Sequence, residues 1–190
     1  MPKRTKAFIA IEMPKVVQKK CLQIQVELAN DFPGVKWTKP DSLHITLLFL
    51  GEIDDKQLWQ ACDLAKKACA DIDPFHFKLH GLGCFPNPRR PRVIWLGIDP
   101  DSGSYFKQLH KEIGSKISDT GFYRMDQKEF QPHLSIGRIN QQDLDFSVVC
   151  SRWKVHPWTS DDIDVNQVLV MSSESIGDEH RYTKLAKIKL

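Results

Sequence analysis

The sequence predicts an α+β fold in which two lobes, each with a largely antiparallel sheet and helices packed outside it, are fused into one bilobal domain over residues 1–190. Segments with helical periodicity interleave with short strand-like segments along the whole chain. One short His-containing pattern occurs twice, about 90 residues apart, each time at the start of an apolar strand. The chain has no Ser- or Gly-rich linker, so the two halves must pack directly against each other.

The first half of the chain predicts two helices and three strands. Apolar residues at helical spacing place the helices at 15–29 and 54–70, and Asp54 or Asp55 is the expected N-cap of the second helix. Gly51 is expected to end the third strand. The three strands are expected at 6–12, 35–38 and 43–50.

The second half begins after Asp73-Pro74, where alternating apolar residues predict a half-buried strand at 75–79. Residues 81–92 are rich in Gly, Pro and Arg, which predicts a loop. Strand content between residues 146 and 158 stays open. The remaining elements are expected to be a strand at 93–98, a helix at 102–118 and strands at 133–137, 165–171 and 182–190.

The composition is that of an ordinary globular protein, with 41% hydrophobic and 27% charged residues, and the net charge of +3 does not by itself select a partner. The apolar stretch at 7–11 is too short for a signal peptide, and no apolar run is long enough to cross a bilayer. We therefore expect a cytoplasmic protein without a membrane partner. The five cysteines are scattered without a CxxC pair, which favours reduced, buried thiols over disulfides or a zinc site.

The repeated pattern is His44-Ile45-Thr46 in one strand and His133-Leu134-Ser135 in another. Residues i and i+2 of a strand point to the same face, so each copy presents an imidazole beside a hydroxyl, while the middle residue points into the core. A single tripeptide of this kind is usually structural. Its repetition, each time after a Pro-containing loop, indicates an internal duplication and a small cleft between two facing strands.

Two imidazoles can give and take protons near neutral pH, and two hydroxyls can bind phosphoryl oxygens. This set predicts phosphate-ester cleavage by His44 and His133, with Thr46 and Ser135 holding the phosphate and with no metal or cofactor. The other histidines are expected at surface or packing positions: His76, His80, His110, His156 and His180.

A stiff basic loop precedes the strand at 93–98. It contains Arg89, Arg90 and Arg92, interrupted by prolines, with aromatic residues nearby. Such a loop suits the backbone phosphates and bases of an RNA end, although an ordinary solvated loop would look the same. Trp95 itself is expected to pack in the core.

Several blocks resemble one known family. They are Ala7 to Ile11, Trp37, Leu43 to Leu47, Phe49-Leu50-Gly51, Phe85 to Gly97 and Pro132 to Arg138. In these blocks, in their order, the chain is similar to the 2H phosphoesterases, and within them to the bacterial and archaeal RNA 2',3'-cyclic phosphodiesterases formerly named 2'-5' RNA ligases.

The resemblance implies two lobes related by a pseudo-twofold axis, with the His strands lining a basic groove, and hydrolysis of 2',3'-cyclic phosphate ends of RNA to 2'-phosphate ends. On that pattern His44 is the general acid that protonates the 3' oxygen, and His133 is the base that activates water. Arg138 resembles an arginine near the phosphate. Regular strand geometry would aim it away from His133, unless a bulge at Gly137 turns it back.

Several alternatives stay open at this point. The site could bind a nucleotide or RNA end without turning it over, join 2'-5' RNA halves in the reverse direction, or cleave small cyclic nucleotides or 2'-5' oligonucleotides. The expected partner is RNA with a 2',3'-cyclic phosphate end, tRNA-like fragments included, and we expect a monomer.

Overall fold

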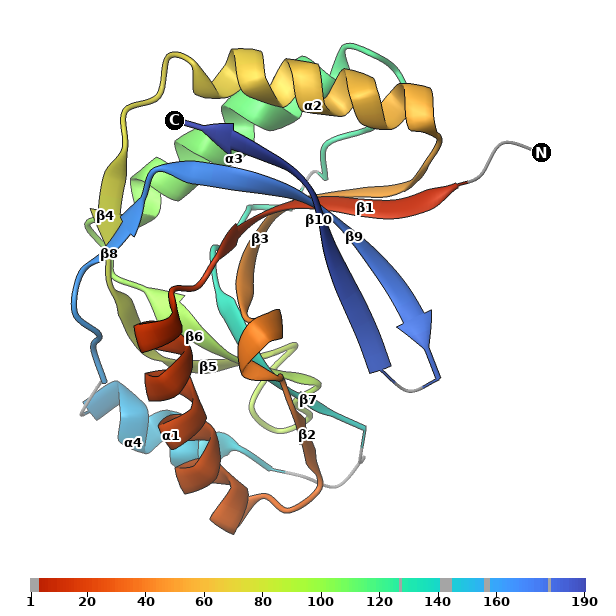
Figure 1. The fold of residues 1–190 in the computed structure, drawn as a ribbon. Coiled ribbons are helices and arrows are strands. Elements are labelled where there is room, and N and C mark those ends of the chain that lie inside the picture. The colour runs from red at the N-terminus through yellow and green to blue at the C-terminus, as the bar shows by residue number, and fades with distance from the viewer. Residues whose placement is uncertain (1–3, 127, 141–144, 156–157, 178) are drawn as a thin grey trace.

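The computed structural model describes residues 4–126, 128–140, 145–155, 158–177 and 179–190, and these form an α+β fold (Figure 1). The strands are β1 (Thr5–Glu12), β2 (Val35–Trp37), β3 (His44–Ile53), β4 (Phe75–Phe77), β5 (Leu79–Phe85), β6 (Val93–Ile98), β7 (Leu134–Ile139), β8 (Ile163–Val165), β9 (Gln167–Ile176) and β10 (Glu179–Lys189). The helices are α1 (Lys15–Asp31), α2 (Asp55–Cys69), α3 (Gly103–Ser118), α4 (Ser147–Val155) and the short 3-10 helix η1 (Pro40–Ser42).

One large sheet runs in the order β10-β9-β1-β3-β7-β6-β5, with β2 also paired to β7, and β4 and β8 form a small second sheet. All strand pairs found in the described residues are antiparallel. The large sheet has two halves, because β3 and β7 are joined only by the pair Ile45↔Leu134. This arrangement confirms the predicted α+β class with antiparallel strands.

Each half of the sheet is covered by two helices. Helices α2 and α3 pack on the half that contains β1 and β3, while α1 and α4 pack on the half that contains β5, β6 and β7 (Figure 1). Two connections each place a helix on the opposite half of the sheet and then return. Helix α1, between β1 and β3, packs on the half that contains β7, and α3, between β6 and β7, packs on the half that contains β3. The two crossovers thus follow the same order of elements, and each half contains one His motif.

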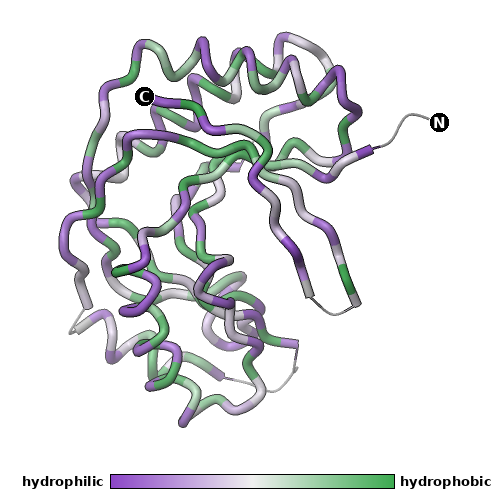
Figure 2. The backbone as a smooth tube through the Cα atoms, viewed as in Figure 1, coloured by the Kyte–Doolittle hydropathy of each residue, from purple (hydrophilic) through white to green (hydrophobic). Residues whose placement is uncertain are grey.

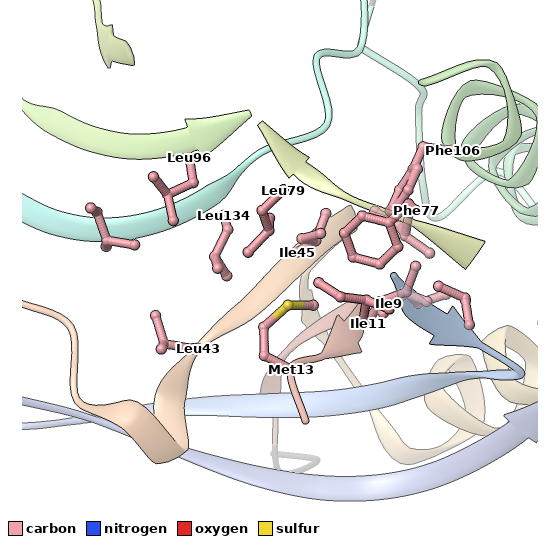
Figure 3. Close-up of a cluster of buried hydrophobic side chains, with 14 of the residues drawn as sticks. Ile9, Ile11, Met13, Leu43, Ile45, Phe77, Leu79, Leu96, Phe106 and Leu134 are labelled. Carbon is pink, nitrogen blue, oxygen red and sulfur yellow. The ribbon is translucent and has the colours of Figure 1, made fainter. Parts of the chain in front are cut away.

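The main hydrophobic cluster extends across the junction of the two halves. Ile45 and Leu134 are both fully buried and lie near the middle of this cluster (Figure 3). Apolar residues run along the central strands and the inner faces of the helices (Figure 2). Fully burying one such side chain contributes about 1.5–3 kcal/mol, so packing at this junction fixes how the two His strands meet.

The first two helices and the early strands lie where the sequence predicted them. Asp54 is the N-cap of α2 in a capping box, in which its Oδ1 accepts from the Gln57 backbone N–H at 2.8 Å and the Gln57 Oε1 accepts from the Asp54 N–H at 3.0 Å. The prediction that Gly51 ends β3 is wrong. Gly51 lies at a β-bulge with a φ of 76°, a conformation that glycine adopts without strain, and the strand continues to Ile53.

The predicted extent of the loop at 81–92 is also wrong. Residues 81–85 were expected in a loop but belong to β5, so the loop covers only residues 86–92. Gly83 is needed there for packing rather than for a turn, because a Cβ on it would lie 2.3 Å from the Trp95 ring. Strand content between residues 146 and 158 was left open by the sequence; residues 147–155 form helix α4, and residues 156–157 lie outside the described residues.

Candidate active site

The register at the junction brings the two His motifs together. Ile45 lies opposite Leu134 and both point into the core, so the residues on either side of them point to the other face of the sheet. In antiparallel register, His44 is then directed toward Ser135, and Thr46 toward His133. The structure thus gathers the two imidazoles and the two hydroxyls on one face, and we call these four residues the paired motifs.

Each catalytic candidate imidazole is oriented by the same hydrogen bond. The His44 Nδ1 lies 2.7 Å from the Ser42 carbonyl oxygen, and the His133 Nδ1 lies 2.7 Å from the Gln131 carbonyl oxygen. A carbonyl oxygen can only accept, so Nδ1 carries the proton and donates in both residues. The Nε2 atom of each imidazole is therefore the nitrogen left to exchange a proton with a bound molecule.

Both imidazoles lie among aromatic rings from neighbouring strands. The His44 ring is 5.0 Å from the Phe8 ring and 5.0 Å from the Tyr182 ring. On the other half, the His133 ring is 4.9 Å from the Phe85 ring and 6.1 Å from the Trp95 ring. These four aromatic rings pack beside the two imidazoles and restrict the space in which each imidazole can rotate.

The prediction that Trp95 packs in the core is wrong. Trp95 is only partly buried, and it pairs with Ser135 across β6 and β7, which places it on the face of the paired motifs. Its indole occupies the space beside Gly83, where a Cβ would lie 2.3 Å from the ring. Alternation in β6 predicts this face correctly, but the apolar character of the surrounding residues outweighed it in the sequence-based prediction.

Burial is the main cause that lowers the pKa of both His44 and His133, because it disfavours the charged imidazolium. The Nδ1–H bonds to backbone carbonyls act in the opposite direction, since they stabilise the charged form. The positive charge of Arg138 also lowers the pKa of both imidazoles, and His133 lowers that of His44. One guanidinium therefore disfavours the charged form of both histidines.

A β-bulge places Arg138 on this face. Gly137 pairs with Ile94 and Ser135 with Trp95, so Ile136 is an extra residue in β7 that reverses the alternation. Ile136 and Ile139 are buried while Arg138 between them is exposed. The bulge that the sequence allowed at Gly137 is present, and Trp37 packs against that glycine, where a Cβ would lie 3.0 Å from its ring.

The same bulge occurs in β3. Leu48 pairs with Ile9 and Thr46 with Ala10, so Leu47 is the extra residue of this bulge. Leu47 lies three positions after His44, and Ile136 likewise lies three positions after His133. Phe49 is consequently turned to the face of the paired motifs. It is 73% exposed, and its ring lies 6.2 Å from the Phe8 ring. The two halves differ at this position, five residues after the histidine: one has a phenyl ring and the other a guanidinium.

The sequence did not predict that four further aromatic residues lie on this face. Phe49 could have been found by comparing the two motifs at the same offset from the histidine. The other three come close to the histidines only through strand pairing, which no local pattern reveals: Phe8, Phe85 and Tyr182.

Arg89, Arg90 and Arg92 are exposed in the loop between β5 and β6. The Asn87 side chain organises the loop, because its Oδ1 accepts from the backbone N–H groups of Arg89 and Arg90, both at 3.1 Å. The Arg92 carbonyl accepts from the Ile139 N–H at 2.9 Å, so the loop adjoins the end of β7 that carries Arg138. The structure places these arginines beyond Arg138 and not between the two histidines.

Within the ranges that the structure describes, no group of three or more His, Cys, Asp or Glu side chains is arranged to hold a metal ion. Over the same ranges, none of the helices is both long enough and apolar enough to span a membrane. Of the remaining histidines, His110 packs against Phe130 and His76 is exposed, whereas His156 lies outside the described residues.

Comparison with known proteins identifies relatives along most of the chain. A protein of Archaeoglobus fulgidus named RNA 2',3'-cyclic phosphodiesterase is 31% identical over 77% of this chain and 79% of its own length. One of Methanocaldococcus jannaschii with the same name is 34% identical over 70% of each chain.

Solved structures share the fold. The protein TT0787 of Thermus thermophilus has a TM-score of 0.82 at 25% identity and covers 97% of each chain, and Escherichia coli LigT complexed with 3'-AMP has a TM-score of 0.75 at 22% identity over 99% of each chain. Residues 11–95, which include His44, match the family described as LigT like Phosphoesterase. Together with the relatives above 30% identity, this match shows that the chain belongs to the LigT-like phosphoesterase family, within the 2H phosphoesterases.

Proposed function

We propose that this chain hydrolyses 2',3'-cyclic phosphate ends of RNA to 2'-phosphate ends, with His44 as general acid and His133 as general base. The observation that carries the proposal is the pairing of Ile45 with Leu134, which presents two imidazoles, each with Nε2 available, on one face. General acid and base groups of this kind each contribute roughly 100- to 10,000-fold to a rate. Two relatives above 30% identity carry the corresponding name.

The reaction needs two proton transfers on opposite sides of the phosphorus. His133 takes a proton from water as the water oxygen forms a bond to phosphorus. The bond from phosphorus to the 3' oxygen breaks, and His44 gives its proton to that oxygen. The 2' oxygen keeps the phosphate, and exchange with solvent returns each imidazole to its starting protonation state.

The remaining polar groups act on the phosphate itself. The hydroxyls of Thr46 and Ser135 donate hydrogen bonds to the non-bridging oxygens, and the Arg138 guanidinium offsets the charge that develops there. A bound phosphate also carries a negative charge, which raises the pKa of His44 again after burial has lowered it in the free protein. Substrate binding thus favours the protonated acid that the reaction requires.

The basic loop serves RNA binding in this proposal. Arg89, Arg90 and Arg92 contact backbone phosphates beyond the end that reacts. The natural substrate is an RNA end with a 2',3'-cyclic phosphate, as a cleaved tRNA carries, in the cytoplasm where such RNA occurs. Residues 1–190 act as one unit and as a monomer, because both histidines come from the same chain.

The test is an assay of the purified protein with excess chelator on a 2',3'-cyclic mononucleotide and on a short RNA with the same end. We expect both to be opened, with the phosphate left on the 2' position, and a variant with His44→Ala and His133→Ala to be inactive. Binding of the RNA without turnover would instead identify a binding protein. Activity that disappears in chelator and returns with a divalent ion would rule out the two-histidine mechanism.

A further inference from the structure

The outer part of the β9–β10 hairpin leaves the sheet. Pairing between β1 and β9 ends at Ala7↔Ser172, whereas pairing between β9 and β10 continues to Ile176↔Glu179. Beyond Ser172 the described residues form a two-stranded ribbon without a third strand, and this ribbon projects from the molecule (Figure 1). We call its residues, 173–176 and 179–182, the arm.

Burial of side chains in the core does not stabilise the arm. Its described side chains are exposed or only partly buried, and its tube in Figure 2 is mostly hydrophilic. A two-stranded hairpin is marginally stable in water unless something packs against it. A polar ribbon that extends beyond the core is therefore better explained as a surface that contacts a partner.

Aromatic rings on one face of the arm continue outward from His44 in a row. Tyr182 contacts His44, with 5.0 Å between the ring centroids, and also contacts Phe8 at 5.5 Å. His180 lies two residues further out and therefore on the same face of the strand. Its ring is 6.3 Å from the Tyr182 ring and within 21° of parallel to it, and its Nδ1 lies 3.4 Å from the Ser175 Oγ.

Of the two cations near the arm, one lies on the opposite face and the other is paired with a carboxylate. Arg181 points to the opposite face of the ribbon, because it lies between His180 and Tyr182 in β10. Lys184, two residues from Tyr182, lies on the same face as the rings, but its charge is paired with Glu12, whose carboxylate oxygen lies 2.6 Å from the Lys184 Nζ. The line from His44 to His180 thus offers ring faces rather than charges. Ring faces bind nucleobases by stacking, with little dependence on base identity.

We propose that the arm binds the RNA chain that precedes the reacting end, with the base of the next-to-last nucleotide stacked on His180. This inference rests on the proposed function, since the cyclic phosphate must lie between the paired motifs. An RNA whose 3' end reacts continues only from its 5' side, and it must leave the site across a surface. Tyr182 is in place beside the terminal nucleotide, and His180 is one ring further out. A mononucleotide does not reach His180.

The first test compares His180→Ala and His180→Phe with the unchanged protein on a hexanucleotide that ends in a 2',3'-cyclic phosphate. We expect kcat/KM to fall about 5-fold or more in His180→Ala, the lower range for one stacked base, and to be restored by His180→Phe. Cleavage of a cyclic mononucleotide, which does not reach His180, serves as the internal reference for both variants. The matched control is His76→Ala, which removes an exposed histidine from β4 and should change neither substrate.

The second test is a double-mutant cycle with the RNA. The unchanged protein should cleave a hexanucleotide that lacks the next-to-last base more slowly than the intact one. This reduced rate should be about the rate at which His180→Ala cleaves the intact hexanucleotide. Combining both changes should add little, because both remove the same stacking interaction. Additive effects, or a His180→Phe variant as poor as His180→Ala, would overturn the stacking of this base on His180.

Fluorescence anisotropy with an uncleavable hexanucleotide that ends in a 2'-phosphate separates the two proposals. His180→Ala should weaken its binding about 5-fold or more without changing the salt dependence, because the substitution removes no cation that binds a phosphate. This measurement does not need turnover. If the unchanged protein cleaves neither cyclic substrate, the proposed function fails, and anisotropy still decides on the arm. Equal binding by the unchanged protein and His180→Ala would overturn the arm alone.

Discussion

Phe49 and Arg138 occupy equivalent positions in the two halves of the sheet. Each lies five residues after a motif histidine, and each is turned onto the face of the paired motifs by a bulge two residues earlier. The similarity between the two halves therefore includes backbone irregularities and not only the tripeptides. Because the side chains differ at this position, one half can bind the phosphate charge while the other presents an apolar ring.

Arg138→Ala is expected to lower kcat/KM by about 10- to 100-fold, the range for removing a hydrogen bond to a charged group. Its removal should also move the acidic limb of the pH profile to higher pH. The guanidinium lowers the pKa of His133, so that pKa rises when the guanidinium is absent. Profiles of kcat/KM against pH would show both effects. Arg152→Ala, an exposed arginine on α4, is the control. An unshifted profile would mean that Arg138 does not act on the histidines.

The unchanged protein is expected to have a bell-shaped pH profile of kcat/KM. The base must be neutral, so activity rises with pH through the pKa of His133, and the acid must be protonated, so activity falls through the pKa of His44. Burial lowers both pKa values in the free protein, so both limbs are expected at lower pH than the pKa of an ordinary histidine would give. The alkaline limb of kcat should lie at higher pH than that of kcat/KM, because bound phosphate raises the pKa of His44. Identical alkaline limbs would argue against this coupling.

The two His motifs and most element positions could be predicted from the sequence because they depend on local alternation and helical spacing. The bulges at Leu47 and Ile136 could not, since a bulge is defined by the partner strand, which is distant in sequence. For the same reason the sequence left the side of Arg138 undecided. It misplaced Trp95 because a partly buried indole beside the face of the paired motifs is as apolar as one in the core.

The junction between the halves should be essential for both stability and rate. Ile45→Ala removes a fully buried side chain and is expected to lower the free energy of unfolding by about 2–5 kcal/mol. It should also reduce kcat more than Ile45→Val, because a small displacement moves both motifs. Denaturant unfolding and turnover measured on the same samples test this. Leu22→Ala, on the partly exposed face of α1, should change stability by less than about 0.5 kcal/mol. Full activity in Ile45→Ala would contradict the importance of this pair.

The basic loop should act on binding and not on the chemical step. Replacing Arg89, Arg90 or Arg92 by Ala is expected to weaken binding of a longer RNA and to reduce the slope of log K against log salt by about 0.7 for each phosphate that the loop no longer binds. Cleavage of a cyclic mononucleotide should hardly change. Titrations at several salt concentrations measure the slope, again with Arg152→Ala as the control. Unchanged binding in all three variants would make the loop structural.

The two histidines should be distinguishable by the leaving group of the substrate. His44→Ala and His133→Ala are each expected to reduce turnover by roughly 100-fold or more, without unfolding the protein. A substrate with a 3' thio or aryl-oxy leaving group needs little protonation as it departs. It should therefore rescue His44→Ala substantially. Water must still be activated, so His133→Ala should stay slow on the same analogue.

The control for this last experiment is the unmodified cyclic substrate, on which both variants should be equally impaired, and thermal unfolding shows that each variant is folded. Rescue of His133→Ala instead of His44→Ala would reverse the two assignments but keep the site. Rescue of neither would show that the pair does not divide the work of acid and base. Since both imidazoles have the same Nδ1 hydrogen bond at 2.7 Å, the hydrogen bonds alone cannot assign the roles, and the leaving group decides between them.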